Sequence, residues 1–176
     1  KCENLTYISV GEGNDAFICV DGVLFNKEKT KLISCSSTKN GIYEIPDTVI
    51  NIGDYAFRGC SGLTKIEIPN SISFIGKYSF SGCTGLKSVK LSESLISVGE
   101  YAFQNCTNLE KVEIGIIGIN IDDTAFEGCG KNPLGSDIEI DWGDILFRDG
   151  SLLVMEGDST SNIAGRESLG YQVTDN

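Results

Sequence analysis

A 23-residue period governs the central part of this sequence. Segments 45–67, 68–90 and 91–113 align without a gap, so that Gly53, Gly76 and Gly99 occupy the same place in each. Four more residue types recur in register, at Tyr55/Tyr78/Tyr101, Phe57/Phe80/Phe103, Cys60/Cys83/Cys106 and Leu63/Leu86/Leu109. Ala125, Phe126 and Cys129 extend the period into a looser fourth copy. Repeats of about 20 to 50 residues are typical of solenoids, in which each unit stacks on the next.

Each unit contains one strand pattern and one turn. Apolar and polar residues alternate at 66–68, 89–91 and 112–114, which is the period of a strand with one buried face. We expect segments 54–57, 77–80 and 100–103 to form one short helical or 3₁₀ turn that directs phenylalanine inward. A single unit cannot bury its apolar face, whereas stacked units share a continuous core. The sequence therefore predicts an α/β-type solenoid, with a parallel sheet on one side and short turns on the other.

The run from Ile45 to Ile66, Ile-Pro-Asp-Thr-Val-Ile-Asn-Ile-Gly-Asp-Tyr-Ala-Phe-Arg-Gly-Cys-Ser-Gly-Leu-Thr-Lys-Ile, resembles the BspA-type leucine-rich repeat of bacterial and protist surface proteins. The resemblance covers residues 45–129 closely. It implies a right-handed superhelix with a concave parallel sheet and helical or 3₁₀ turns on the convex side. Family members commonly lie at the cell surface, and some are adhesins. The resemblance thus implies a non-enzymatic adhesion or recognition module whose partner is a host or bacterial surface protein.

The flanks of the regular repeats carry weaker copies and two insertions. Cys2, Leu5, Ile8 and Val10 have the spacing of Cys60, Leu63, Ile66 and Ile68, so the chain is expected to begin inside a preceding repeat of a longer solenoid. Export or anchoring signals would then lie outside this chain. Two largely apolar segments, 23–25 and 31–33, predict one inserted β-hairpin, and two more, 145–147 and 152–154, predict a second. The second surrounds Asp149-Gly150, a favoured hairpin turn.

These patterns define one solenoid segment over residues 1–176. Its parts are a partial repeat at 1–10, an enlarged repeat with a hairpin at 11–44, three regular repeats at 45–113, a divergent repeat at 114–140, and a hairpin with a terminal segment at 141–176. Strand rungs are expected at residues 8–10, 43–45, 66–68, 89–91, 112–114, 138–140 and 171–173.

Five of the seven cysteines, at positions 2, 60, 83, 106 and 129, share one place in the repeat. The simplest interpretation is a column of buried thiols that pack as small apolar groups. Stacked strands hold neighbouring Cβ atoms about 4.8 Å apart, beyond the distance that a disulfide prefers, and a column cannot converge four ligands on a metal. Cys19 and Cys35 flank the first hairpin outside this column, and a disulfide between them remains an alternative.

Several classes of chemistry lack the residues they need. The chain has no histidine, and its net charge of −11 disfavours a nucleic-acid partner. Residues 122–176 hold 12 acidic and 3 basic side chains, but an EF-hand over Asp137 to Arg148 would place Trp142 where glycine is required. No apolar run is long enough to span a membrane. We therefore expect no catalytic, cofactor or metal site.

The candidate binding residues are those that face outward from the predicted strands. Charged residues alternate between neighbouring units there, as in the column Glu67, Lys90, Glu113. The predicted binding face consists of Tyr7, Ser9, Thr64, Lys65, Glu67, Lys87, Ser88, Lys90, Glu110, Lys111 and Glu113.

Each of these surfaces has a plainer interpretation. The charged columns are equally explained by cross-strand ion pairs that keep the sheet soluble, and the chain by a spacer that has no ligand of its own. The tyrosine column, Tyr55, Tyr78 and Tyr101, is either a row of half-buried spacers on the convex side or an aromatic strip for a partner or a sugar. Asn105 occupies the turn position of Gly59 and Gly82, although it also begins an Asn-x-Thr sequon. The hairpins mark another possible binding face.

Overall fold

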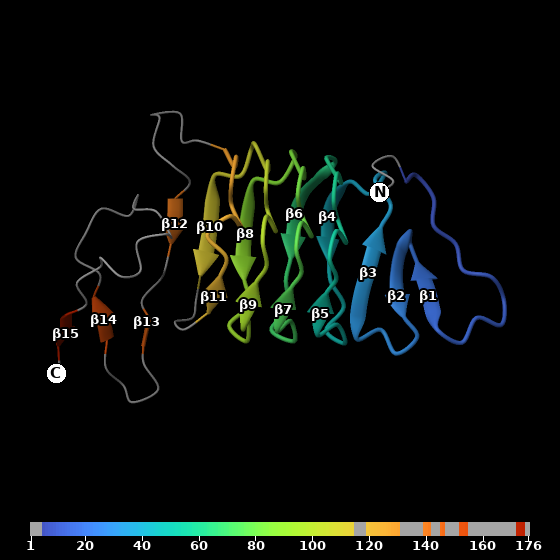
Figure 1. Cartoon of the computed structure of the whole chain (residues 1–176), viewed down its shortest axis with the longest axis horizontal. Helices are drawn as coiled ribbons and strands as arrows, with labels where there is room; N and C mark the ends of the chain where they lie inside the picture. The colour runs from blue at the N-terminus through green and yellow to red at the C-terminus, as the bar shows by residue number, and fades with distance from the viewer. Residues whose placement is uncertain are drawn as a thin grey trace.

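The computed structural model of the chain describes residues 5–114 and 119–130, together with the backbone of four short strands at 139–141, 145–146, 152–154 and 172–174. It is a solenoid in which parallel strands stack along one axis (Figure 1). Among the described residues there is no helix, so none that could span a membrane.

One side of the stack is a five-stranded parallel sheet, here named the long-strand sheet. Its order is β12-β10-β8-β6-β4. The strands are β4 (Gly41–Glu44), β6 (Leu63–Glu67), β8 (Ser88–Leu91), β10 (Lys111–Ile114) and β12 (Glu139–Asp141). Ile66 pairs with Val89, and Val89 with Val112, as the repeat alignment predicts. The predicted rungs from 43–45 to 138–140 are therefore confirmed.

A second parallel array, which the repeat pattern did not predict, joins the N-terminal hairpin to form the short-strand sheet. Its order is β1-β2-β3-β5-β7-β9-β11. The strands are β1 (Phe17–Val20), β2 (Val23–Asn26), β3 (Lys31–Cys35), β5 (Asn51–Ile52), β7 (Phe74–Ile75), β9 (Ser97–Val98) and β11 (Asn120–Ile121). Four of them are only two residues long, too short to show an alternating pattern. Each still contributes one buried aliphatic residue, Ile52, Ile75, Val98 or Ile121, to the core.

The predicted helical or 3₁₀ turns are wrong in detail. Amides in segment 54–60 alternate between two kinds of partner: Phe57 N–H donates to Ser79 O in the next coil at 2.6 Å, whereas Arg58 N–H donates to Tyr55 O at 3.1 Å. Tyr55 lies in the left-handed region, with φ at 62°, and so do Tyr78 and Tyr101. A helix would bond every amide locally. Here every second amide joins coil to coil instead.

Phenylalanine and cysteine form two buried columns along the axis, as predicted. The rings of Phe57, Phe80 and Phe103 are fully buried and stack with centroids 5.0 and 4.9 Å apart. Phe126 continues the column at 5.1 Å, although it is only partly buried. Each described thiol of the column, from Cys60 to Cys129, donates to a carbonyl oxygen of the preceding coil, as Cys83 Sγ does to Phe57 O at 3.1 Å. The thiols are thus both packed and hydrogen-bonded.

The first predicted hairpin is confirmed. β2 and β3 pair antiparallel, with Val23 opposite Cys35, and β1 adds to β2 through a two-residue turn at Asp21-Gly22. Both turn residues have positive φ, 49° and 76°, as the favoured hairpin turn requires. Cys19 and Cys35 are free thiols, so the alternative of a disulfide between them is not realised. Cys19 aligns with Leu24 and Cys35 with Val23, so the two point to opposite faces of the sheet.

Two predicted rungs at the ends of the chain are wrong. Residues 8–10 form no strand, and the segment lies beside β1 of the antiparallel hairpin, where Cys19 Sγ donates to Ile8 O. The rung at 171–173 does not join the stack either. β15 (Gln172–Thr174) pairs antiparallel with β14 (Leu152–Val154), which pairs antiparallel with β13 (Ile145–Leu146). This three-stranded sheet contains the second predicted hairpin.

Candidate functional site

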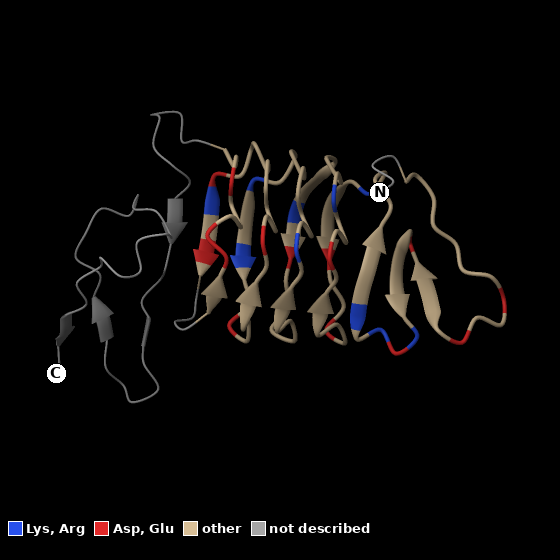
Figure 2. Cartoon of the chain, viewed as in Figure 1, with Lys and Arg blue, Asp and Glu red and all other residues tan. Residues whose placement is uncertain are grey.

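The outward face of the long-strand sheet collects the polar side chains of successive coils. In β6, Leu63 and Ile66 are buried whereas Thr64, Lys65 and Glu67 are exposed. Because successive residues of a strand point to opposite faces, and the coils are in register, outward residues of neighbouring strands form columns about 4.8 Å apart. Figure 2 shows Lys and Asp/Glu residues following one another across β6, β8 and β10. We name this surface the polar face.

Nine of the eleven predicted binding residues lie on or beside the polar face. They are Thr64, Lys65 and Glu67 on β6, Lys87, Ser88 and Lys90 at β8, and Glu110, Lys111 and Glu113 at β10. The register places Lys65 beside Ser88 and Ser88 beside Lys111, and it places Lys90 between Glu67 and Glu113. The column Glu67, Lys90 and Glu113 and the column Lys65, Ser88 and Lys111 are therefore side by side on three neighbouring strands.

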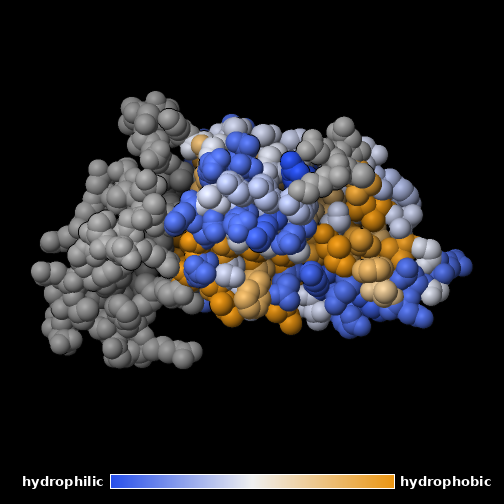
Figure 3. All heavy atoms as spheres, viewed as in Figure 1, coloured by the Kyte–Doolittle hydropathy of each residue, from blue (hydrophilic) through white to orange (hydrophobic). Residues whose placement is uncertain are grey.

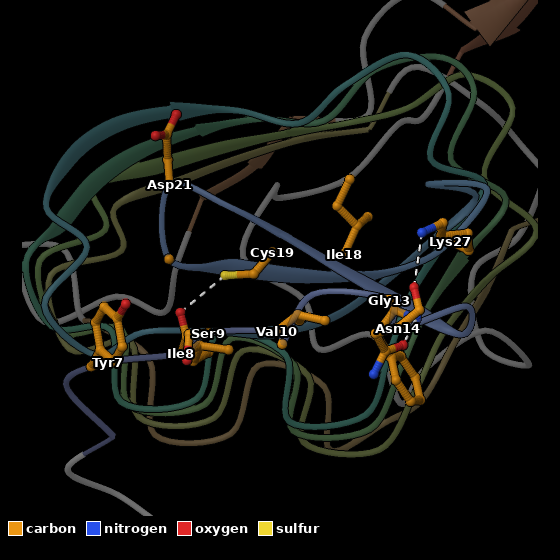
Figure 4. Close-up of a pocket in the computed structure, with 13 residues that line it drawn as sticks. Tyr7, Ile8, Ser9, Val10, Gly13, Asn14, Ile18, Cys19, Asp21 and Lys27 are labelled. Carbon is orange, nitrogen blue, oxygen red and sulfur yellow. Dashed lines mark hydrogen bonds between the residues drawn. The ribbon is translucent and has the colours of Figure 1, made fainter.

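Tyr7 and Ser9 are not on the polar face. With no strand at 8–10, they line a pocket of about 440 Å³ at the N-terminal end, between segment 7–11 and β1 (Figure 4). Tyr7 is 77% exposed. The opposite wall carries Ile18 and Asp21, and Lys27 Nζ donates to Asn14 O at 2.8 Å beside it. The spacing of Leu5, Ile8 and Val10 matches that of a strand, so it predicted Tyr7 on the sheet, but the structure has no strand there.

Among the described side chains, the ion pairs of the polar face lie within strands and not across them, unlike the cross-strand pairs considered in the plainer interpretation. Lys65 Nζ lies 2.8 Å from Glu67 Oε1, and Lys111 Nζ lies 3.4 Å from Glu113 Oε1. Residues two apart on a strand share a face, so each pair is local to its own strand. The hydrogen bond to Glu67 raises the pKa of Lys65. Exposed pairs of this kind are worth about 0–1 kcal/mol, so they tune the surface more than they hold the fold.

Lys90 differs from the other cations of this face. On β8, Ser88 occupies the place that Lys65 and Lys111 have on their strands. Lys90 occupies the place at which β6 and β10 carry glutamate. Within the described part of the chain, no carboxylate lies within ion-pair distance of Lys90. Lys87 lies three residues before Lys90. Together the two lysines give β8 a positive charge that its own strand does not neutralise.

The tyrosine column lies on the turn side and is half-buried. The Tyr55 and Tyr78 rings stack at 5.2 Å and 6°, and those of Tyr78 and Tyr101 at 4.9 Å and 21°. Each ring therefore covers a face of its neighbour. A sugar packs on exposed aromatic faces, so this arrangement favours the spacer interpretation over an aromatic strip. Among the described residues, no cluster of three or more Cys, Asp or Glu side chains is arranged to hold a metal ion.

The sequence matches the model of one protein family. A profile of the BspA type leucine-rich repeat region matches residues 28–134, in six copies. No curated protein matches the sequence.

Solved structures share the fold. The pneumococcal vaccine antigen PcpA is 28% identical with a TM-score of 0.66, over 77% of this chain and 36% of its own. A leucine-rich repeat protein from Bacteroides capillosus is 25% identical with a TM-score of 0.55, over 66% of this chain and 99% of its own. A leucine rich cell surface protein from Faecalibacterium prausnitzii, 24% identical with a TM-score of 0.51 over 66% of this chain and 38% of its own, shows the fold alone. The chain therefore spans little more than a third of PcpA.

Proposed function

Because this chain belongs to the BspA-type leucine-rich repeat family, we propose that it is a non-enzymatic protein-recognition module of a cell-surface or secreted protein. The polar face is its binding surface, and the partner is a protein. The family resemblance supports the location and the class of partner. The residues that contact the partner are proposed from the geometry of the polar face.

The observation that carries this proposal is the register of the polar face. Its side chains stand on strands whose other face is buried in a shared core, so a partner would meet them already ordered. Preorganised contacts avoid part of the entropy that binding otherwise costs. Lys87 and Lys90 provide a positive centre between flanking carboxylates, which fits an acidic side chain of a partner set among hydrogen-bonding groups.

The test is a pull-down with the intact chain from extracellular matrix and bacterial surface proteins, followed by affinity measurement for each captured protein. Lys90→Glu should weaken binding at least about tenfold, because it reverses the central charge of the face. Lys77→Glu makes the same charge change on the turn side, where Lys77 pairs with Glu100 at 2.9 Å, and should leave binding unchanged. Equal effects of both substitutions would place the contact elsewhere.

A spacer without a ligand is the second candidate, and the local ion pairs favour it. Lys65 and Lys111 neutralise carboxylates of their own strands, which leaves much of the polar face electrically satisfied without a partner. A spacer predicts that joint charge reversal at Lys65, Lys90 and Lys111 changes no cell-binding phenotype of the parent protein.

A further inference from the structure

Three large apolar side chains are exposed on the outward face of the short-strand sheet. Phe74, the first residue of β7, is 43% exposed, and Ile50 and Ile96, which directly precede β5 and β9, are 42% and 55% exposed. We name these three residues the apolar strip. Figure 3 shows hydrophobic atoms gathered below the hydrophilic band of the polar face, in the region where Figure 1 places β5, β7 and β9. Exposed apolar groups that lie together mark interaction sites, whereas single ones need no explanation.

The three side chains lie on consecutive coils in the middle of the stack. Ser73 N–H donates to Ile50 O at 2.9 Å, and Ile96 N–H donates to Ser73 O at 2.8 Å. Ser73 therefore stands between the two isoleucines, and Phe74 follows it on the same coil. The sheet continues on both sides, since β3 pairs with β5 and β11 pairs with β9. The apolar strip is thus flanked by described coils in both directions.

The stacking of the coils does not require apolar residues at these positions. The middle coil has Ser73 where its neighbours have isoleucine. The position of Phe74 is polar in the other coils, which carry Asn51, Ser97 and Asn120 there. Each residue of the apolar strip can therefore be replaced, for a test, by the residue that a neighbouring coil already carries.

The borders of the apolar strip are acidic. Four exposed carboxylates lie on the turns before and after the short strands, namely those of Asp47, Glu93, Asp54 and Asp123. Among the described residues, none of the four has a lysine or arginine within ion-pair distance. Lys77, on the border after the strands, already pairs with Glu100 at 2.9 Å. Lys29 and Lys31 belong to the hairpin at the Ile50 end, so they leave the four carboxylates without a cation.

These charges indicate which partner fits the strip. A second copy of this chain would bring the same carboxylates to the contact. The chain's own residues 122–176 hold 12 acidic and 3 basic side chains, so they are also of like charge. Like charges across an interface disfavour a partner, whereas opposite charges steer it into place. The borders therefore fit a partner that carries lysine or arginine on both sides of an apolar ridge.

The spacing of the strip fits a helix better than a strand. Neighbouring coils are about 4.8 Å apart, so Ile50 and Ile96 are separated by about 9.6 Å along the stack axis. Residues i and i+7 of an α-helix are about 10.5 Å apart on one face, with i+3 and i+4 between them. Alternate residues of a strand are about 6.7 Å apart and lose register with the coils after one step. One helix face can therefore contact all three coils.

We propose that the apolar strip binds an amphipathic helix of a partner protein, which lies across the three coils along the stack axis. Its apolar side chains contact Ile50, Phe74 and Ile96, and its lysine or arginine side chains face the carboxylates of the borders. Recognition through one apolar helix face, with anchors at this spacing, is a recurring mode of peptide binding. The site goes beyond the proposed function, because the polar face belongs to the other sheet and uses different residues.

The experiment measures binding of two labelled peptides of identical composition to the full chain by fluorescence anisotropy. Lys-Ala-Leu-Lys-Lys-Leu-Leu-Lys-Ala-Leu-Lys-Lys sets leucine at helical spacing, whereas Lys-Leu-Lys-Leu-Lys-Leu-Lys-Leu-Lys-Ala-Lys-Ala alternates as a strand does. The helical peptide should bind at least about fivefold more tightly, and its counterpart with glutamate for every lysine should not bind. Equal binding of the two isomers, or binding of the glutamate peptide, would overturn the proposal.

Variants of the chain locate the contact. Phe74→Ser and Ile96→Ser should each weaken binding of the helical peptide by about fivefold or more, and if one fails to fold by circular dichroism the other still decides. Ile42→Ser removes an aliphatic side chain that is 61% exposed on the long-strand sheet, and should leave binding unchanged. Undiminished binding to both strip variants, or an equal loss in Ile42→Ser, would overturn the proposal.

Two further measurements test the charge and the occupant. Glu93→Gln should weaken binding by about twofold, whereas Glu12→Gln, the same change of charge on the N-terminal loop, should not, and equal effects would overturn the proposal. Self-association of the chain that Phe74→Ser abolishes, read by sedimentation, would also overturn it, because a second copy would then occupy the strip. Phe74→Ser alters no residue of the polar face and Lys90→Glu alters none of the strip, so this site and the proposed function fail separately.

Discussion

The thiol of Cys83 donates to the carbonyl oxygen of Phe57 in the preceding coil, at 3.1 Å. Cys106 makes the same contact with Phe80, at 3.2 Å. Each thiol is fully buried. The cysteine column is therefore a set of coil-to-coil hydrogen bonds inside the apolar core, and it couples the position of each turn to that of the phenylalanine before it.

Burial raises the pKa of the Cys83 thiol, so this group stays protonated in the folded chain. Native Cys83 should resist iodoacetamide at pH 8, whereas the half-buried Cys19 should react faster, as measured by mass spectrometry of peptides. Since the folded pKa lies above the unfolded value of about 8.5, the stability due to this thiol is complete below pH 8.5 and is lost as the pH rises beyond it. Labelling of Cys83 at the rate of Cys19 in the native chain would contradict the burial of the column.

Phe80→Ala should lower the free energy of unfolding by roughly 3–5 kcal/mol, because the ring is fully buried between Phe57 and Phe103. Lys87→Ala, on the polar face, should change it by no more than about 0.5 kcal/mol. Denaturant titration of both variants measures the difference. Similar losses from the two substitutions would mean that the inward and outward positions are wrongly assigned.

Ser79→Ala should stabilise the chain by about 0.5–2 kcal/mol. Ser79 is fully buried, and its hydroxyl has no hydrogen-bond partner among the described groups. Ala56, Ala102 and Ala125 occupy the same position of the other coils, so the methyl group fits there without rearrangement. A rise in melting temperature checks this expectation; a fall would indicate that a bound water satisfies the hydroxyl.

Tyr78→Gly should be more stable than Tyr78→Ala by about 1 kcal/mol, the reverse of the usual order of these residues within regular structure. Tyr78 has φ at 53°, where a residue with a Cβ is strained and glycine is not. Both variants lose the ring stacking equally, so their difference in unfolding free energy reports the backbone alone. An alanine variant as stable as the glycine variant would show that the turn changes conformation when the ring is removed.

The repeat alignment predicts the long-strand sheet, its register and its core because strand periodicity and identical residues are local signals. Phe57 and Val89 are buried where the alignment puts them. The short-strand sheet was not predictable in the same way, since β5 and β7 are two residues long and depend on neighbours one coil away. Positive φ at Tyr55 was also hidden, because tyrosine gives no sign of a left-handed turn, whereas Asn105, in the place of glycine, did.

The candidate site was predictable in its composition and less so in its pairing. Spacing placed Lys90 between Glu67 and Glu113, as the structure does. It did not show that Lys65 would form its ion pair with Glu67 on the same strand, because that pairing depends on side-chain rotamers.

The alternating amides of the turn side give the stack a direction. Phe57 N–H bonds to Ser79 O, the next peptide group's Phe80 N–H bonds to Ala102 O, and Phe103 N–H bonds to Ala125 O, at 2.6, 2.7 and 2.7 Å. Peptide dipoles in this chain of bonds point the same way, as they do in an α-helix, and polarise one another. On the turn side, one end of this chain of bonds therefore presents a carbonyl oxygen and the other an amide hydrogen. Polarisation along such a chain increases with its length, so a coil added at an end strengthens the turn-side bonds next to it.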